Sequence, residues 1–387
     1  GNVNFVAAAK DGSGRLASAA DVPMDAVRVY QVDMNDISRS PYLSFSGIRN
    51  GSESDAWAYY PATMRWGKAY GVQHLLLVGY SPRSRKGEDS DIPEDKRNTG
   101  AVALYDTINH RDVPVSTARS ANVFEVAWHS TLPRFIAATS PCSLSVDPGV
   151  RTQILLFERD RDSEDERYVV YQMLDCWAVD INELTFMSNS LVHAYVTAAC
   201  TDGKVYVWDT AQDDKPIHVL QHGASLEIFD EEQRERLDTG VKFTAWGTTL
   251  DRFYTGGSDG AVNVWNVRNL TRPHVRLLLE APAPIASGAW SPDMRKLAIG
   301  DATGRLWLFS VDKRDAPKTH FMKVGAKLRR CPRPVLLHSD PPPPPVNAAG
   351  SYDVAMDIDG GAPGEPEIVA YSAKTYFDPG ILADTRN

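Results

Sequence analysis

Short apolar runs separated by turn-forming residues recur along the whole chain. The runs are rich in Val, Ile, Leu and aromatic residues, and many end at Asp-Gly or Thr-Gly pairs. Gly accepts a positive φ without steric cost, so these pairs favour tight hairpins between antiparallel strands. In Val205–Asp209, apolar side chains fall on both faces, which is typical of a strand whose sheet is covered on both sides. The pattern therefore predicts many short strands in stacked sheets.

Two consecutive stretches of the second half share the same order of runs. In each, a run ending in Trp precedes a closing aromatic residue by 19 positions (246 to 265 and 290 to 309). The closing aromatics are 44 positions apart (265 to 309), a period typical of folds in which each repeat is one small sheet. Looser copies come earlier in the chain. Six closing strands are predicted in all, at Tyr30, Tyr105, Phe157, Trp208, Trp265 and Phe309.

The clearest motifs are Thr201–Thr210 and Ser258–Val267, in which an Asp-Gly turn precedes a strand ending in Trp-Asp or Trp-Asn. Together with Ala289–Asp293, they resemble the WD-repeat (WD40) β-propeller family over roughly residues 1–312. The resemblance implies an all-β, WD40-type β-propeller. The family usually has seven blades, of which six are recognisable here.

The chain also departs from the family pattern. Only Trp208-Asp209 keeps the Trp-Asp dipeptide, the Gly-His dipeptide is absent, and His222 is its nearest stand-in. The resemblance implies a hydrogen-bond tetrad of His, Asp, Ser or Thr, and Trp, which we expect in at most one blade. We therefore interpret the chain as a divergent member.

Composition changes after residue 312, which predicts a propeller over 1–312 and a C-terminal extension over 313–387. The extension contains a basic segment, the polyproline run Pro341–Pro345 and an acidic tail. A seventh blade could come from residues 319–337 and 367–377, from sequence before Gly1, or from a partner.

The net charge is −9 and the sequence pI is about 5.5. An overall negative charge argues against binding of nucleic acid through the charge of the whole chain. A local basic cluster suits a nuclear-import signal, a nucleic-acid contact or an ordinary solubilising strand edge. Four scattered cysteines predict buried thiols in a reducing compartment. The basic cluster comprises Lys323, Lys327, Arg329, Arg330 and Arg333.

The chain contains no Gly-rich phosphate loop, no nucleophile elbow and no metalloprotease motif. We therefore expect a protein that is not an enzyme and needs neither cofactor nor metal. No apolar run approaches the length of a membrane span, and the first residues lack the pattern of a secretory signal.

The positive interpretation is a binding module, because a propeller presents loops on a rigid scaffold. The insertions Ser81–Asn98 and Gly223–Gly240 could contact a partner. The charged run Phe229–Asp238 suits a solvated short helix or loop, or an acidic docking site, and Arg159–Arg167 suits a hairpin turn. Six residues near the starts of the inner strands are predicted to face the channel mouth and contact partner subunits: Thr63, Glu125, Asp180, Lys242, Phe243 and Ser287.

A sharper hypothesis attaches to Trp265–Arg268. In WD-repeat substrate receptors of cullin-RING ubiquitin ligases, a closing Trp-Asp followed one residue later by Arg helps dock the adaptor; here Asn266 replaces Asp. Related members include a subunit of a ligase-linked histone methyltransferase complex that forms heterochromatin. The function is thus predicted as a non-catalytic scaffold in a multiprotein, chromatin-associated complex, in the nucleus or the cytoplasm, with the nucleus favoured. The alternatives are a ligase substrate receptor and a nucleic-acid-binding subunit acting through residues 323–333.

Overall fold

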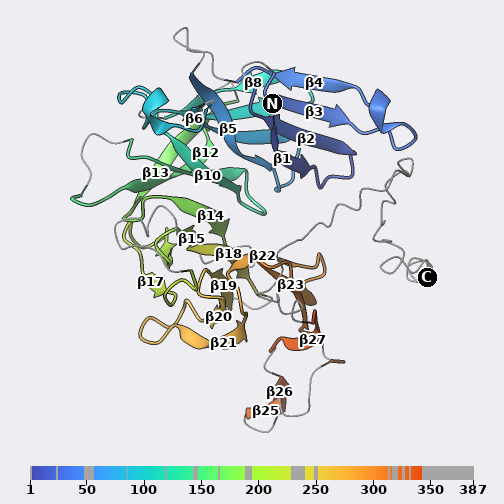
Figure 1. Ribbon diagram of the computed structural model, residues 1–387, viewed down its shortest axis with the longest axis vertical. Coiled ribbons are helices and arrows are strands. Elements are labelled where there is room, and N and C mark those ends of the chain that lie inside the picture. The colour runs from blue at the N-terminus through green and yellow to red at the C-terminus, as the bar shows by residue number, and fades with distance from the viewer. Residues whose placement is uncertain are drawn as a thin grey trace, which may run out of the picture. The chain divides into compact units, whose positions relative to one another are not determined.

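The computed structural model places more than half of its described residues in β-strands, nearly all of them antiparallel, with two short 3-10 turns (Figure 1). The described residues all belong to one compact unit. The structure describes residues 2–22, 25–47, 56–84, 86–117, 120–142, 147–163, 166–187, 194–227, 240–247, 252–312, 314–315, 321–324, 327–330, 333–341.

The first three sheets each begin at the inner strand and proceed outward. Sheet 1 contains β1 (Val3–Ala8), β2 (Arg15–Ala20), β3 (Val27–Gln31) and β4 (Tyr42–Phe45). Sheet 2 contains β5 (Trp57–Trp66), β6 (Leu75–Ser84), β7 (Ala101–Asp106) and β8 (Arg111–Val113). Sheet 3 contains β10 (Val123–Trp128), β11 (Arg134–Thr139), β12 (Thr152–Arg159), β13 (Tyr168–Cys176) and the short parallel β9 (Val115–Ser116).

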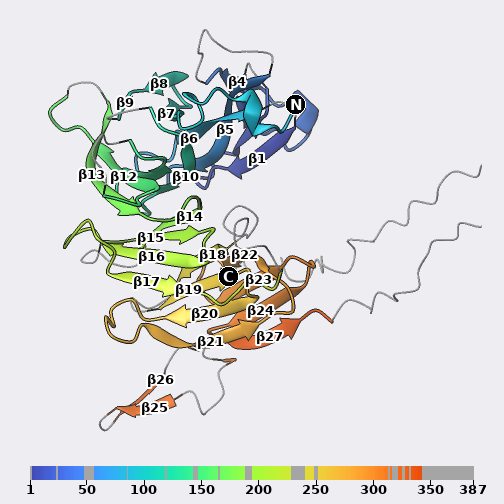
Figure 2. The ribbon, with the colours of Figure 1, turned by 60° about the vertical axis from the view of Figure 1, so that its left-hand side comes forward.

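The next three sheets repeat this order, and Figure 2 shows the four strands of sheet 4 side by side. Sheet 4 contains β14 (Ile181–Phe186), β15 (Tyr195–Cys200), β16 (Lys204–Asp209) and β17 (His218–Gln221). Sheet 5 contains β18 (Val241–Trp246), β19 (Phe253–Gly257), β20 (Ala261–Trp265) and β21 (His274–Glu280). Sheet 6 contains β22 (Ile285–Trp290), β23 (Lys296–Asp301), β24 (Leu306–Ser310) and β27 (Val335–Ser339). A separate hairpin pairs β25 (Phe321–Val324) with β26 (Lys327–Arg330).

Consecutive sheets pack face to face, and their innermost strands contact one another in chain order from β1 to β22. In the described residues, one large core cluster lies between each pair of consecutive sheets. All six inner strands carry a register irregularity, for example between Val123 and Glu125 and between Val241 and Phe243. It lies near the start of five strands and in the middle of the longer β5. This shared bulge shows that the six sheets are structural repeats of one unit.

The strands of the central sheets are more deeply buried than those of the two terminal sheets. In sheets 3 and 4, strands β11 and β15 are buried on nearly every residue, so both faces of these sheets are covered. In β2 and β23, buried and partly exposed residues alternate. Within the described residues, the first and last sheets therefore each leave one face uncovered.

The structure confirms the predicted closing strands, because all six closing aromatics lie on the third strand of a sheet. The Asp-Gly turns also form as expected, with a positive φ at Gly203 and Gly260. Arg159 on β12 pairs with Tyr168 on β13, and the N–H of Asp160 donates to the carbonyl of Arg167, as expected at a hairpin. Beyond residue 312, β27 supplies the outer strand of sheet 6.

Several predicted segments lie outside the described residues. These are the charged run at 229–238, most of the polyproline run and the acidic tail. The proposed division at residue 312 and the seventh blade stay predictions.

Candidate partner-binding surface

A buried hydrogen-bond chain stabilises sheet 5. Asp259 in the β19–β20 turn accepts from Nδ1 of His222 at 3.0 Å, and His222 Nε2 lies 2.7 Å from the Thr255 hydroxyl. Trp265 Nε1 donates to the same hydroxyl at 2.7 Å. This is the tetrad implied by the resemblance, and it holds the end of β20 in one position.

The tetrad does not form in sheet 4, although that sheet keeps the Trp-Asp dipeptide. Within the described residues, the buried Trp208 Nε1 has no hydrogen-bond partner. Asp209 instead accepts the backbone N–H of Ala211 and organises the turn after β16. The dipeptide and the tetrad are therefore separate features of this chain.

Arg268 lies on a rigid turn that follows β20. Asn266 Oδ1 accepts the backbone N–H of Arg268 at 3.2 Å, which is the role that Asp209 plays in sheet 4. Val267 between them is fully buried, and its carbonyl lies 2.6 Å from Nε2 of His218. The Arg268 side chain is exposed. Replacement of Asp by Asn thus keeps the geometry that presents the guanidinium.

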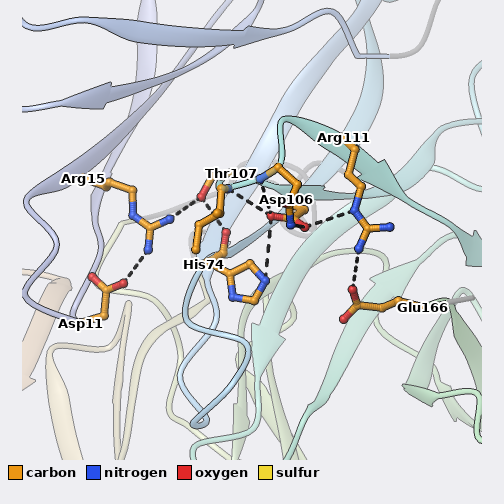
Figure 3. Close-up of polar contacts among 9 residues, drawn as sticks. Asp11, Arg15, His74, Asp106, Thr107, Arg111 and Glu166 are labelled. Atoms are coloured by element: carbon orange, nitrogen blue, oxygen red, sulfur yellow. Dashed lines mark hydrogen bonds and ion pairs between the residues drawn. The ribbon is translucent and has the colours of Figure 1, made fainter.

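The corresponding turn of sheet 2 is bound into a polar network (Figure 3). The buried Asp106 accepts from the backbone N–H groups of Ile108 and Asn109 and from Arg111. Burial alone would raise the pKa of Asp106, but these hydrogen bonds outweigh it and lower the pKa. The turn therefore has little freedom to rearrange.

This network also joins three sheets (Figure 3). Arg15 of sheet 1 donates to the Thr107 hydroxyl at 2.7 Å and pairs with Asp11 at 2.5 Å. Arg111 of sheet 2 pairs with Glu166, just before β13, at 2.9 Å. Polar contacts therefore connect the loops of sheets 1, 2 and 3 on this side.

We call the loops after the first and third strands of each sheet the loop edge, because alternating strand directions place them on the same side. Within the described residues, the loop edge exposes six large hydrophobic side chains, whereas the loops of the opposite edge expose only Trp177 and Leu226. Tyr70 is 97% exposed, and Ile108 and Leu270 are 66% and 68% exposed. The six are Met34, Ile37, Tyr70, Ile108, Leu132 and Leu270.

Two of the six predicted contact residues form a buried pair. Thr63 on β5 donates to Glu125 on β10 at 2.5 Å, and Arg65 approaches the other carboxylate oxygen at 3.1 Å. Both Thr63 and Glu125 are largely removed from solvent. Burial raises the pKa of Glu125 despite the nearby guanidinium.

The other four lie in different surroundings. Lys242 and Ser287 are exposed on the inner strands of sheets 5 and 6. Phe243 is only 2% exposed and packs between these two sheets, so its side chain is a core contact. Asp180 precedes β14 and accepts the N–H of Ile181, and burial raises its pKa. A position near the start of an inner strand therefore does not by itself expose a side chain to solvent.

Glu183 was not among the residues predicted from the sequence, although it occupies the inner-strand position of sheet 4 that corresponds to Glu125 in sheet 3. Its carboxylate accepts from the backbone N–H and the hydroxyl of Thr244, at 2.6 and 2.7 Å. Burial raises its pKa to about 7, against these opposing hydrogen bonds. The signal available in the sequence was an acidic residue just inside a predicted inner strand.

The basic cluster falls largely on a hairpin. Lys323 lies on β25, and Lys327, Arg329 and Arg330 lie on β26, whereas Arg333 follows the hairpin and is exposed. Its binding role stays a prediction. In the described part of the chain, no group of three or more His, Cys, Asp or Glu residues is arranged to hold a metal ion. None of its helices is long and apolar enough to cross a membrane.

Comparison with solved structures places this architecture among known folds. The structure of the Dos1 propeller superposes with a TM-score of 0.57 and 22% identity, over 80% of this chain and 67% of that one. A chain of the mitotic checkpoint complex superposes with a TM-score of 0.51 and 17% identity, over 77% and 71%. The chain has the fold of the WD-repeat propellers. No family model matches it.

One curated relative adds sequence evidence. Rik1-associated factor 1 of Schizosaccharomyces pombe is 35% identical over 133 residues, which are 34% of this chain. The match spans 20% of the relative's length.

Proposed function

We propose that this chain is a non-catalytic propeller subunit of a multiprotein complex and that it binds its partner through the loop edge. The observation that carries the proposal is the concentration of exposed Tyr70, Ile108 and Leu270 on the edge that also presents Arg268. Aromatic residues and Arg are enriched at interfaces, and a rigid surface loses little entropy on binding.

The finer proposal concerns the partner. Arg268 follows Trp265 at the spacing that ligase substrate receptors use to dock an adaptor, and Asn266 preserves the turn. The curated relative is named for its association with Rik1, and we extend that kind of partner to this chain. We therefore propose a nuclear, chromatin-associated ligase complex in which the Trp265–Arg268 turn contacts the adaptor.

Affinity capture from nuclear extract with Arg268→Ala tests this proposal. Arg272→Ala is the matched control, because Arg272 is an exposed arginine of the same loop. We expect adaptor recovery to fall at least about tenfold for Arg268→Ala and to stay unchanged for Arg272→Ala, since a central interface Arg contributes roughly 1.4 kcal/mol or more.

Two outcomes would separate the general from the finer proposal. Recovery of the same complex by both variants would support a scaffold but reject docking through Arg268. Tyr70→Asp then tests the loop edge itself, because a carboxylate there disrupts an apolar contact and leaves the fold intact at a fully exposed position. If this variant also retained all partners, the loop edge would not be the binding surface.

A further inference from the structure

A cavity opens where the inner strands end. It has a volume of about 290 Å³ and is lined from β5, β10, β14, β18 and β22 and the residues that follow them. Phe186, Trp246 and Trp290 contribute aromatic rings, and Lys68, Arg65 and Glu183 contribute charged groups. The cavity is therefore both apolar and charged, as ligand sites commonly are.

The cations of this cavity are incompletely neutralised. Arg65 pairs with Glu125 at 3.1 Å. The side chain of Lys68 is exposed. Among the described residues, its ammonium group has no ion pair or hydrogen bond. Partial removal from water lowers the pKa of Lys68, and the positive charges of Lys10 and Arg65 lower it further, whereas Glu183 opposes this shift.

The nearby carboxylates offset this positive charge only in part. Glu125 is engaged by Arg65 and Thr63, and Glu183 accepts two hydrogen bonds from Thr244. With a pKa of about 7, Glu183 is protonated in a large share of molecules at neutral pH. A chain of net charge −9 thus contains a local cationic cavity with a free ammonium group.

We propose that this cavity binds an acidic peptide segment of a protein partner, with one carboxylate on Lys68 and a neighbouring apolar side chain against the aromatic rings. A carboxylate of the peptide would pair with the ammonium group of Lys68, and the aromatic rings of the cavity would favour an apolar side chain beside that carboxylate. The proposal is independent of the Trp265–Arg268 turn, which lies in the loop after β20 and does not line the cavity.

The test is fluorescence anisotropy with a labelled short peptide of alternating Glu and Leu. Control peptides in which Gln or Lys replaces Glu show whether binding depends on the negative charge of the peptide. We expect only the Glu peptide to bind, and we expect its Kd to rise when the salt concentration is raised from about 0.05 M to about 0.3 M, because salt screens an accessible ion pair.

Variants locate the peptide on the protein. Lys68→Glu should raise the Kd at least about tenfold, and Lys68→Arg should retain binding. Lys215→Glu should not affect the Kd, since Lys215 is an exposed lysine of the β16–β17 loop that does not line the cavity. Circular dichroism checks that each variant is folded. Equal binding of the Gln peptide, or unchanged binding by Lys68→Glu, would overturn the proposal. Arg268→Ala should bind the peptide normally, so failure here is distinguishable from failure of the adaptor proposal.

Discussion

At the residue scale, the position of a side chain relative to two sheets decides its chemistry. Thr63, Glu125 and Phe243 lie at corresponding points of their inner strands, just after the shared bulge. Thr63 and Glu125 bond to each other across neighbouring sheets, whereas Phe243 packs against sheet 6. The same local position therefore yields a polar contact in one repeat and a core contact in another.

Glu183 gives a pH prediction at this scale. Its folded-state pKa is about 7 instead of the usual 4.5, so the folded state holds the proton more tightly than the unfolded chain. This contribution to stability is complete below pH 4.5 and is lost as pH rises to 7, at a cost of up to about 3 kcal/mol. Glu183→Gln should remove that loss. Urea unfolding of both proteins from pH 5 to 7.5 checks it, and parallel stability curves would contradict it.

At the element scale, each central sheet is stabilised by neighbours on both faces, and the terminal sheets by one neighbour. Ala198 on β15 is completely buried, whereas Ala298 on β23 lies on the uncovered face of sheet 6 and is partly exposed. Both are alanines in the second strand of a four-stranded sheet, so they form a matched pair.

For this matched pair, we expect a substituted carboxylate to lower the free energy of unfolding by unequal amounts. Ala198→Asp should lower the free energy of unfolding by at least about 3 kcal/mol, because the carboxylate would be buried without a partner. Ala298→Asp should cost less than about 1 kcal/mol, because water reaches that face. Denaturant unfolding measures both values. Similar losses for the two variants would show that sheet 6 is covered on both faces in solution.

At the scale of the whole molecule, the six sheets form a chain of nearest-neighbour contacts. In such an arrangement, stability is the sum of terms for each unit and each interface, so units with one interface open more readily. Hydrogen exchange should therefore be slowest for amides of β11 and β15 and faster for β2 and β23. Mass spectrometry of exchanged peptides checks this order. Uniform protection would indicate one cooperative unit or an additional neighbour on the terminal sheets.

The sequence by itself determined the third strands and their turns. Closing aromatics such as Trp208 and Trp265 stand next to apolar residues, and the Asp-Gly turns place Gly203 and Gly260 where a positive φ is required. These are local preferences that need no knowledge of the rest of the molecule. The repeat spacing then indicated a propeller, and the comparisons with solved structures confirmed that fold.

Only the tertiary structure decided which residues meet. His222 joins Asp259 and Thr255 because the end of sheet 4 lies against sheet 5, and Lys68 comes near Glu183 because inner strands converge. The outer strands were also invisible in the sequence, since they are short, partly exposed and defined by the strand beside them. The physical reason is that burial, hydrogen-bond partners and pKa depend on neighbours distant in the chain, whereas strand and turn preferences depend on adjacent residues.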